Sequence, residues 1–305
     1  MNRNSPLTLT LALALTLLAC ACSTTESTGL RDEDLPKPIV TQAEDSLGKF
    51  LADVDGVVAR WSVLSMTAKS AAEQREARML EQLLIERTSK RRDELVHELE
   101  SGPPINRIRA AAALGFTHSV EAQSPLLNAL HDSSADVVHN ALLGLAILAR
   151  ADTPLEEICR LAEDSPDPQT RSQAAYAMRT IVGAGAEPQS AVPTARRGLI
   201  SQEPLVRAEC ALTLGLAGDA PSVPALGDLL ADSVPFVTQA AVKALVLLAK
   251  KEPSQKGAVG RALLACHANS KGALAERTME GLVQISDVNY GTDVKLWTEW
   301  AQRLP

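Results

Sequence analysis

Histidine and cysteine are the residue types in this chain that could act as metal ligands, nucleophiles or proton carriers near neutral pH. Only one of the five histidines, His97, is followed by a glutamate, Glu98, and the others are not grouped with further ligands at a metal-binding spacing. The five cysteines form no CxxC pair, and Cys159, Cys210 and Cys266 fall on apolar faces of expected helices, where a thiol packs as a small hydrophobic group. The glycine-rich phosphate loop and the GxSxG and HExxH motifs are also missing from the sequence. We therefore predict no catalytic site, no metal and no cofactor.

One chemical modification is nevertheless expected, at Cys20. Residues 1–19 carry a single positive charge ahead of an apolar run of about 13 residues, which is typical of a secretory signal and too short to span a bilayer. The run ends in LLAC (residues 17–20), which resembles the lipobox of bacterial lipoproteins. The resemblance implies cleavage before Cys20 and lipidation of its thiol. Because residue 21 is not aspartate, it also favours the outer membrane of a cell with two membranes. An ordinary signal peptide and lipidation of Cys22 are the alternatives.

Helical repeats are expected to position most of the remaining side chains. The clearest copy, residues 204–232, reads as two antiparallel amphipathic helices, with a proline in the first turn of the first helix. Gly215 and Gly218 are expected to end that helix, and Asp219 to cap the second. Further copies recur at intervals of about 31 to 36 residues, a period that indicates a solenoid. They start near Pro104, Asp136, Pro168 and Pro235.

The runs PLVRAECALTLG (204–215) and VPALGDLLAD (223–232) resemble the HEAT repeat in its short bacterial form. The resemblance covers roughly 180 residues. It implies an all-α fold, a right-handed α-solenoid (superhelix) of HEAT-like helical hairpins, with helical caps at both ends because a solenoid must cover its open faces. HEAT-like chains serve mostly as protein-binding scaffolds, so the resemblance is specific for fold and says little about function.

The sequence divides into five expected parts. They are a lipoprotein signal peptide (1–19), a lipid-anchored flexible tether (20–42), an N-terminal helical cap (43–100), HEAT-like repeats (101–290) and a C-terminal cap (291–305). Residues 43–100 could instead pair with another chain. Trp297 and Trp300 lie on one helix face, where they either cover the last repeat or form an aromatic docking site.

Charge helps to define the class of partner. The formal net charge is −7, and the polar residues of the expected second helices have mixed signs, which argues against nucleic acid. We expect the second helices to build a concave surface that contacts a protein. The expected partner-binding residues are Asn128, Glu157, Arg160, Arg197, Asp228, Arg261, Trp297 and Trp300.

These observations favour a non-catalytic protein-binding scaffold or adaptor, held at the bacterial cell envelope by the lipid on Cys20 and touching the membrane through that anchor alone. Two alternatives stay open. One is an enzyme or enzyme subunit of the HEAT-like lyase type, whose site is too dispersed to recognise in one sequence. The other is a structural envelope component that self-associates through residues 43–100.

Overall fold

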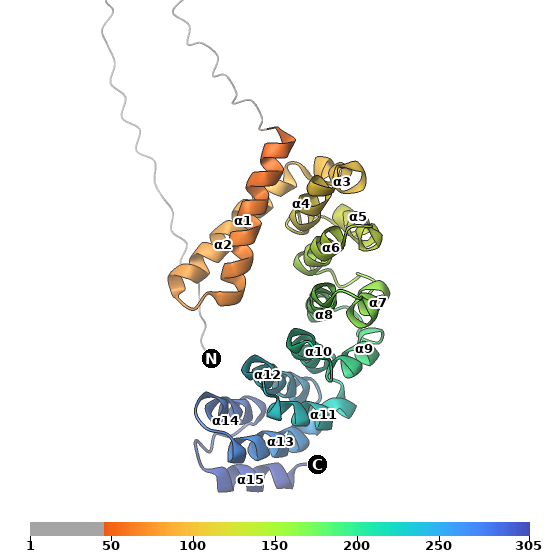
Figure 1. Cartoon of the computed structure of the whole chain (residues 1–305). Coiled ribbons are helices and arrows are strands. Elements are labelled where there is room, and N and C mark those ends of the chain that lie inside the picture. The colour runs from red at the N-terminus through yellow and green to blue at the C-terminus, as the bar shows by residue number, and fades with distance from the viewer. Residues whose placement is uncertain (1–45) are drawn as a thin grey trace, which may run out of the picture. The chain divides into compact units, whose positions relative to one another are not determined.

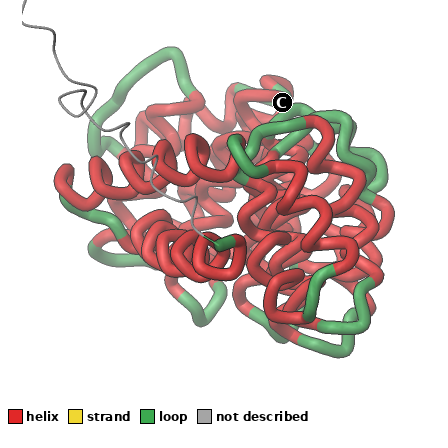
Figure 2. The backbone as a smooth tube through the Cα atoms, turned by 90° about the horizontal axis from the view of Figure 1, so that it is seen from above, coloured by secondary structure: helices red, strands yellow, loops and turns green. Residues whose placement is uncertain are grey.

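The computed structural model describes residues 46–305. The expected signal peptide, the tether, Cys20 and its alternative Cys22 lie outside the described residues. Within them the chain consists of helices and connecting loops and contains no strand, as expected for an all-α solenoid (Figure 2). None of the described helices is both long and apolar enough to cross a membrane.

The helices of residues 92–285 form two rows in a curved stack, and the inner row follows the concave side (Figure 1). The inner row comprises α4 (Pro104–Gly115), α6 (Ala135–Leu148), α8 (Pro168–Gly183), α10 (Pro204–Ala217), α12 (Pro235–Lys251) and α14 (Ala273–Ile285). The outer row comprises α3 (Arg92–Ser101), α5 (Gln123–Asn128), α7 (Glu156–Asp164), α9 (Ala191–Gly198), α11 (Val223–Asp228) and α13 (Lys256–Asn269). Single 3₁₀ turns precede or follow several outer helices, at Val120–Ala122 (η2), Ala129–His131 (η3), Ala220–Ser222 (η4), Leu229–Ala231 (η5) and Pro253–Gln255 (η6).

The ends of α10 show which turn signals in the sequence were interpreted correctly. Pro204 occupies the first position of the helix, as do the first prolines of α4, α8 and α12, which confirms the expected starts. Gly218 ends α10 in the left-handed conformation at φ 72°. Gly215, however, lies inside the helix, and the Asp219 side chain caps no backbone N–H. It accepts hydrogen bonds from Arg196 and from the hydroxyl of Ser222 instead, so these two expectations were wrong.

Small residues let neighbouring inner helices approach closely. A Cβ placed on Gly115 would lie 2.6 Å from the carbonyl oxygen of Gly144, and one placed on Gly215 would lie 2.6 Å from that of Ala244. Such distances leave no room for a side chain. Contacts are denser along the inner row than along the outer row, which produces the concave inner side.

Each proline-first helix pairs with the helix before it in the sequence, and not with the helix after it as we expected. We expected α10 to pack against the helix that follows it, yet α10 packs against the preceding α9 and has few contacts with α11. The proline-first helix is therefore the second member of each pair, and it forms the concave face. The first pair, α3 with α4, starts at Arg92, so the expected cap boundary after residue 100 falls inside α3.

Helices at both ends pack against the stack. The N-terminal hairpin of α1 (Leu47–Thr67) and α2 (Ala71–Ser89) rests mainly on α4, where the indole of Trp61 meets the buried ring of Phe116 edge to face at 4.9 Å. At the other end, α15 (Val294–Arg303) packs against α13. Whether the N-terminal hairpin serves only as a cap stays a prediction.

Candidate functional site

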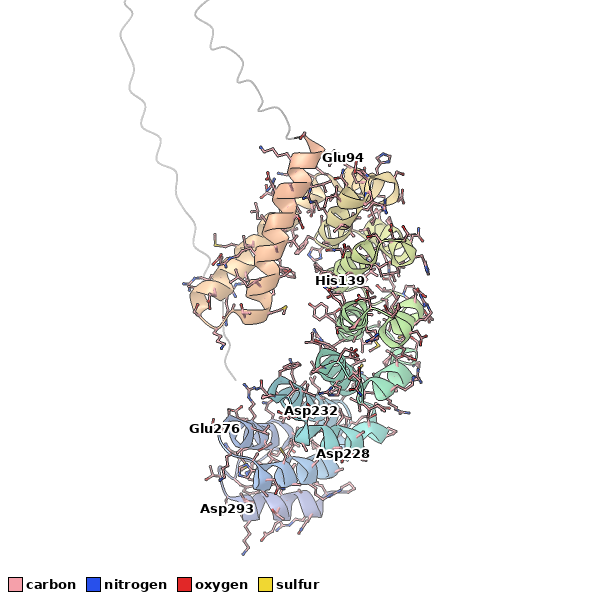
Figure 3. All side chains as sticks on the ribbon, in the orientation of Figure 1. Glu94, His139, Asp228, Asp232, Glu276 and Asp293 are labelled. Carbon is pink, nitrogen blue, oxygen red and sulfur yellow. The ribbon has the colours of Figure 1, made fainter. Side chains whose placement is uncertain are left out.

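The expected partner contacts lie on the outer row. The helices α5, α7, α9, α11 and α13 carry all six polar residues: Asn128, Glu157, Arg160, Arg197, Asp228 and Arg261. Figure 3 shows Asp228 on α11, in the outer row, whereas Glu276 projects from α14 on the inner side. The expectation that these residues line the concave surface was wrong, because the hairpins were assigned one helix out of phase.

Several of these outer side chains make contacts within the solenoid. Arg160 donates to Glu157 at 2.8 Å, and this hydrogen bond lowers the pKa of the Glu157 carboxyl. The guanidinium of Arg197 pairs with Glu163 and so joins α9 to α7. Arg261 donates to the carbonyl oxygen of Ala301 at 2.8 Å and so joins α13 to α15. Bonds of this kind contribute to the stack itself.

Trp297 cannot contact a partner, because it is fully buried. Its indole N–H donates to the carbonyl of Gly291 at 2.9 Å, and its ring lies edge to face with Tyr290 and Trp300. Trp300 is half-buried against Gly260 of α13. The indoles therefore cover the last helix pair, and the alternative of an aromatic docking site was wrong for Trp297.

A groove crosses the inner row and is lined by inner-row residues. One part, of about 540 Å³, runs over α6, α8, α10 and α12, and a second part, of about 280 Å³, lies between α12 and α14. The two parts share Lys243 and Leu247, so they form one surface, which we call the inner groove. Because no outer-helix residue lines it, the groove opens on the concave side.

Register within each inner helix explains which side chains reach the groove. The eighth and twelfth residues after the first residue of α10 are Leu212 and Leu216, and those of α12 are Lys243 and Leu247. Residues four apart share one helix face, so these positions form a column that faces away from the outer row. The spacing of these residues is present in the sequence. It predicts the lining of the groove only when the proline-first helix is known to be the inner helix of each pair.

The inner groove is basic although the whole chain is acidic. Its lining includes Arg179, Lys243, Lys250 and Arg277, whereas Glu280 is the one carboxylate among the described residues that line it. Arg179 pairs with Glu209 and covers the ring of Tyr176, and Lys250 donates to the side-chain carbonyl of Gln284 at 3.2 Å. Lys243 and Arg277 are exposed, and no hydrogen bond or ion pair joins either to another residue within 46–305. These two cations are available to an outside group.

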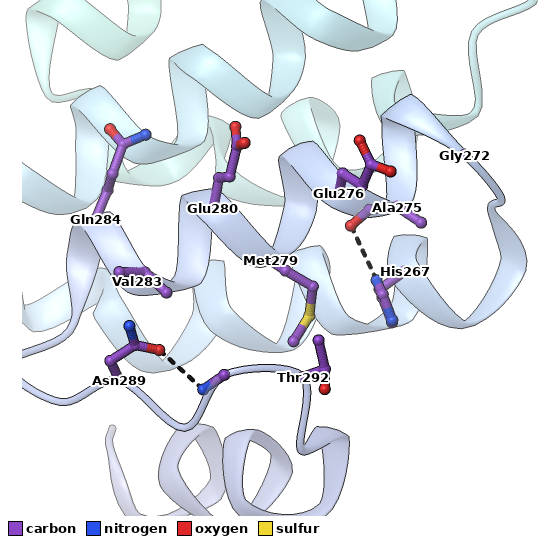
Figure 4. A pocket seen from close by; sticks show the side chains of 11 residues that line it. His267, Gly272, Ala275, Glu276, Met279, Glu280, Val283, Gln284, Asn289 and Thr292 are labelled. Carbon is purple, nitrogen blue, oxygen red and sulfur yellow. Dashed lines mark hydrogen bonds between the residues drawn. The ribbon is translucent and has the colours of Figure 1, made fainter.

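A second cavity, of about 790 Å³, lies beside the groove at the C-terminal end, between α14 and the loop before α15 (Figure 4). Its lining carries the carboxylates of Glu276 and Glu280 above the apolar side chains of Met279 and Val283. His267 donates from Nδ1 to the carbonyl oxygen of Ala275 at 3.1 Å, because that oxygen can only accept. Glu280 lines both the cavity and the inner groove, and so marks the border between an acidic and a basic surface.

The thiols of the described part are placed for packing. Cys159 and Cys210 are buried, and Cys266 is half-buried. Burial raises the pKa of Cys159 to about 11 and that of Cys210 to about 12, so both stay protonated and weakly nucleophilic at neutral pH. Across residues 46–305 no three histidine, cysteine or carboxylate side chains gather where they could hold a metal ion.

Comparisons with solved structures bear on the fold. An engineered protein is similar over 84% of this chain and 82% of its own, with 19% identity and a TM-score of 0.50. A designed armadillo repeat protein covers 63% of this chain and 99% of its own, with 17% identity and a TM-score of 0.49. The complex of CpcE and CpcF of phycocyanin lyase from Nostoc sp. PCC7120 covers 82% of this chain and 100% of its own, with 17% identity and a TM-score of 0.41. No curated protein matches the chain.

Comparison with family models shows which sequence family the chain belongs to. The model of HEAT repeats matches residues 92–179 and 155–246, which together span about half of the chain, from the start of α3 into α12. The start of the match coincides with α3, the first helix of the first pair. The expected resemblance is therefore confirmed, and the chain belongs to the HEAT repeat family.

Proposed function

We propose that this protein is a non-catalytic scaffold or adaptor that binds another protein through the inner groove. The observation that carries the proposal is the groove itself, on the concave side of a repeat solenoid. There leucine side chains lie beside two cations that have no partner within residues 46–305. Concave surfaces of this kind present a long, continuous area to an extended partner. The raised pKa of Cys159 and Cys210 argues against catalysis by either of these thiols, because a protonated thiol is a poor nucleophile.

Site-specific photocrosslinking in the producing cells tests this proposal. A photoreactive amino acid at Gln239, an exposed residue of the groove, should give an adduct with a defined protein. The same amino acid at Arg160, an exposed residue of the outer row, is the matched control and should give none. An adduct from Arg160 alone would move the interface to the outer row. Absence of protein adducts from both positions would contradict the scaffold role.

The proposal includes attachment to the cell envelope through lipid on Cys20. Its support is the lipobox-like LLAC run after a signal-like apolar segment. Two or three acyl chains hold a protein stably on a membrane, so the repeats would work close to the envelope, on the outer membrane where the cell has two.

Fractionation of cells that produce cysteine variants tests the anchor. Cys20→Ala should move the protein from the membrane fraction to the soluble fraction, because its only expected lipid is lost. Cys22→Ala is the matched control and should stay with the membranes. If Cys22→Ala is the variant that is released, the modified residue is Cys22. Membrane association of the double variant would show that no lipid on either cysteine is needed.

A further inference from the structure

The inner groove combines an apolar floor with positive charge, and this combination specifies a partner. We propose that its occupant is an acidic protein segment that carries leucine or similar apolar side chains. The inference deepens the proposed scaffold function and rests on it. It specifies the charge and apolar character of the bound segment, whereas the scaffold proposal says only that the ligand is a protein.

Charge complementarity is the first argument. Lys243 on α12 and Arg277 on α14 line the same part of the groove, and neither has a partner among the described residues. A carboxylate that reaches them forms new ion pairs without breaking existing ones, unlike a carboxylate near Arg179, which Glu209 already neutralises. Because the chain as a whole carries a net charge of −7, an acidic segment is disfavoured over most of the surface and attracted here.

The apolar floor is the second argument. Leu212 and Leu216 of α10 and Leu247 of α12 line the part of the groove next to Lys243, and all three are partly exposed. Val242 and Val246, both buried, complete the floor between α12 and α14. Covering these side chains is favourable only for a ligand with apolar groups of its own. A segment of carboxylates alone would leave the leucines exposed to water.

The same residues disfavour other polyanions. Single-stranded nucleic acid is held by aromatic side chains on which its bases stack, and among the described residues that line the groove none is aromatic. A flat membrane surface cannot reach the concave side of the stack, where the groove opens. A protein segment is the anionic ligand that fits both the shape and the leucine floor.

The length of the segment follows from helix spacing. The groove crosses from α6 to α14, and neighbouring packed helices lie about 8–10 Å apart, so it is roughly 36 Å long. An extended chain advances about 3.3 Å per residue, so about eleven residues span the groove.

Fluorescence anisotropy with synthetic peptides and the purified full chain tests the inference. The probe is a labelled peptide of about eleven residues made of glutamate and leucine. One matched peptide has lysine in place of glutamate, and another has serine in place of leucine. Lys243→Glu/Arg277→Glu reverses the charge of the two groove cations that have no partner in the described part of the chain. Lys271→Glu/Lys295→Glu makes the same change of net charge at exposed residues that do not line it.

We expect the glutamate–leucine peptide to bind the native chain and to bind the groove variant at least about tenfold more weakly, with little change for the control variant. The lysine–leucine peptide should show the opposite preference, and the serine peptide should bind weakly to every protein. Circular dichroism should be the same for all variants, because both groove cations are exposed.

Equal binding of the acidic peptide to all variants, or no binding to the native chain, would overturn the inference. Tighter binding of single-stranded DNA or anionic vesicles, lost in the groove variant, would overturn it in favour of another polyanion. These outcomes leave the scaffold proposal to be judged separately, since the crosslink from position 239 reports any protein in the groove. A crosslinked contact segment that is basic would reject the inference and keep the scaffold.

Discussion

Three arginines connect consecutive helix pairs at one edge of the stack. Arg107 pairs with Asp132, Arg171 with Glu203 and Arg207 with Asp232, and each acidic residue lies just before the next inner helix. The same guanidinium groups donate to carbonyl oxygens of the loop before their own helix, at Gly102, Ser165 and Ser201. Each arginine therefore fixes its own loop and the following pair together.

Removal of one of these arginines should be costly. The side chains of Arg207 and Asp232 are only 14% and 9% exposed, so Arg207→Ala leaves a poorly solvated carboxylate and two loop carbonyls without their donor. We expect a loss of about 2–4 kcal/mol in the free energy of unfolding, measured with urea. Arg160→Ala, which breaks an exposed pair with Glu157, is the control and should cost less than about 1 kcal/mol. Equal losses would show that the Arg207 pair is no stronger than a surface pair.

His139 gives the stability a pH dependence near neutrality. Burial lowers the pKa of its imidazole, although Asp167 and Asp136 nearby favour the charged form. Its Nδ1 is buried and has no hydrogen-bond partner among residues 46–305. Because the folded pKa lies below the unfolded value of about 6.5, the unfolded chain binds more protons in this range. Stability is therefore complete above about pH 7 and falls as the pH drops through the unfolded pKa toward the lower folded one.

Replacement of His139 by phenylalanine should remove most of this dependence. Urea unfolding of the native chain should give a lower free energy at about pH 5.5 than at about pH 7.5. His139→Phe should show a smaller difference between the two pH values, because its ring does not titrate. His118→Phe, at an exposed histidine, is the control and should behave as the native chain does. An undiminished difference in His139→Phe would assign the pH dependence to other groups.

At the scale of the elements, the spacing of α10 and α12 depends on Gly215. A Cβ at this position would lie 2.6 Å from the carbonyl oxygen and 2.7 Å from the Cα of Ala244, and backbone atoms cannot move aside as a flexible side chain can. The helices would have to separate, and the packing of two consecutive pairs would loosen. Gly215→Ala should therefore destabilise the chain by about 1–3 kcal/mol, measured by urea unfolding.

Gly56 provides the matched control for Gly215→Ala. It lies within α1, is exposed, and has open space where a Cβ would be. Gly56→Ala should stabilise the chain by about 0.5–1 kcal/mol, because alanine is the better helix former. If both substitutions stabilised the chain, the close approach of α10 and α12 would not constrain the fold.

Helix type and position could be predicted from the sequence, whereas the pairing of helices could not. Prolines at helix starts and apolar stripes are local signals, so α4, α8, α10 and α12 begin where Pro104 and its counterparts predict. Every interior helix of a solenoid has an apolar neighbour on both sides along the chain, and the periodicity is the same for either pairing. The sequence therefore did not determine which neighbouring helices form a pair. For the same reason it did not determine whether Asn128 and Arg160 lie on the concave or the convex side.

The groove was missed for the same reason. Lys243 belongs to a helix that was expected on the convex side, and Arg277 has Glu276 and Glu280 close by in the sequence, so neither cation could be recognised as free from the sequence. Burial of Trp297 was also unpredictable in detail, because it depends on the loop that brings the carbonyl of Gly291 to its indole N–H. Long-range placement of this kind follows from how α15 returns to α13, which no local pattern encodes.

At the scale of the whole stack, described here for residues 46–305, each helix pair contacts mainly its neighbours. In such a fold stability is close to a sum of pair terms and neighbour terms, so a defect at one end should stay near that end. Trp297 lies at the C-terminal end and is fully buried against the last pair. Its N-terminal counterpart is Trp61, whose ring packs on Phe116 of the first pair.

Trp297→Ala should therefore loosen the C-terminal helices selectively. Removal of a buried indole costs about 3–5 kcal/mol, and the loss should fall on α13, α14 and α15. Native-state hydrogen exchange read by mass spectrometry should show faster exchange there and unchanged protection in α4 and α6. Trp61→Ala should give the reverse pattern, with faster exchange in α1 and α4. A uniform loss of protection in either variant would show that the stack unfolds as one cooperative unit. The helices of the inner groove would then have the same stability against opening as the rest of the stack. A local loss would mean that its two ends, near α6 and near α14, can be stabilised independently by whatever binds there.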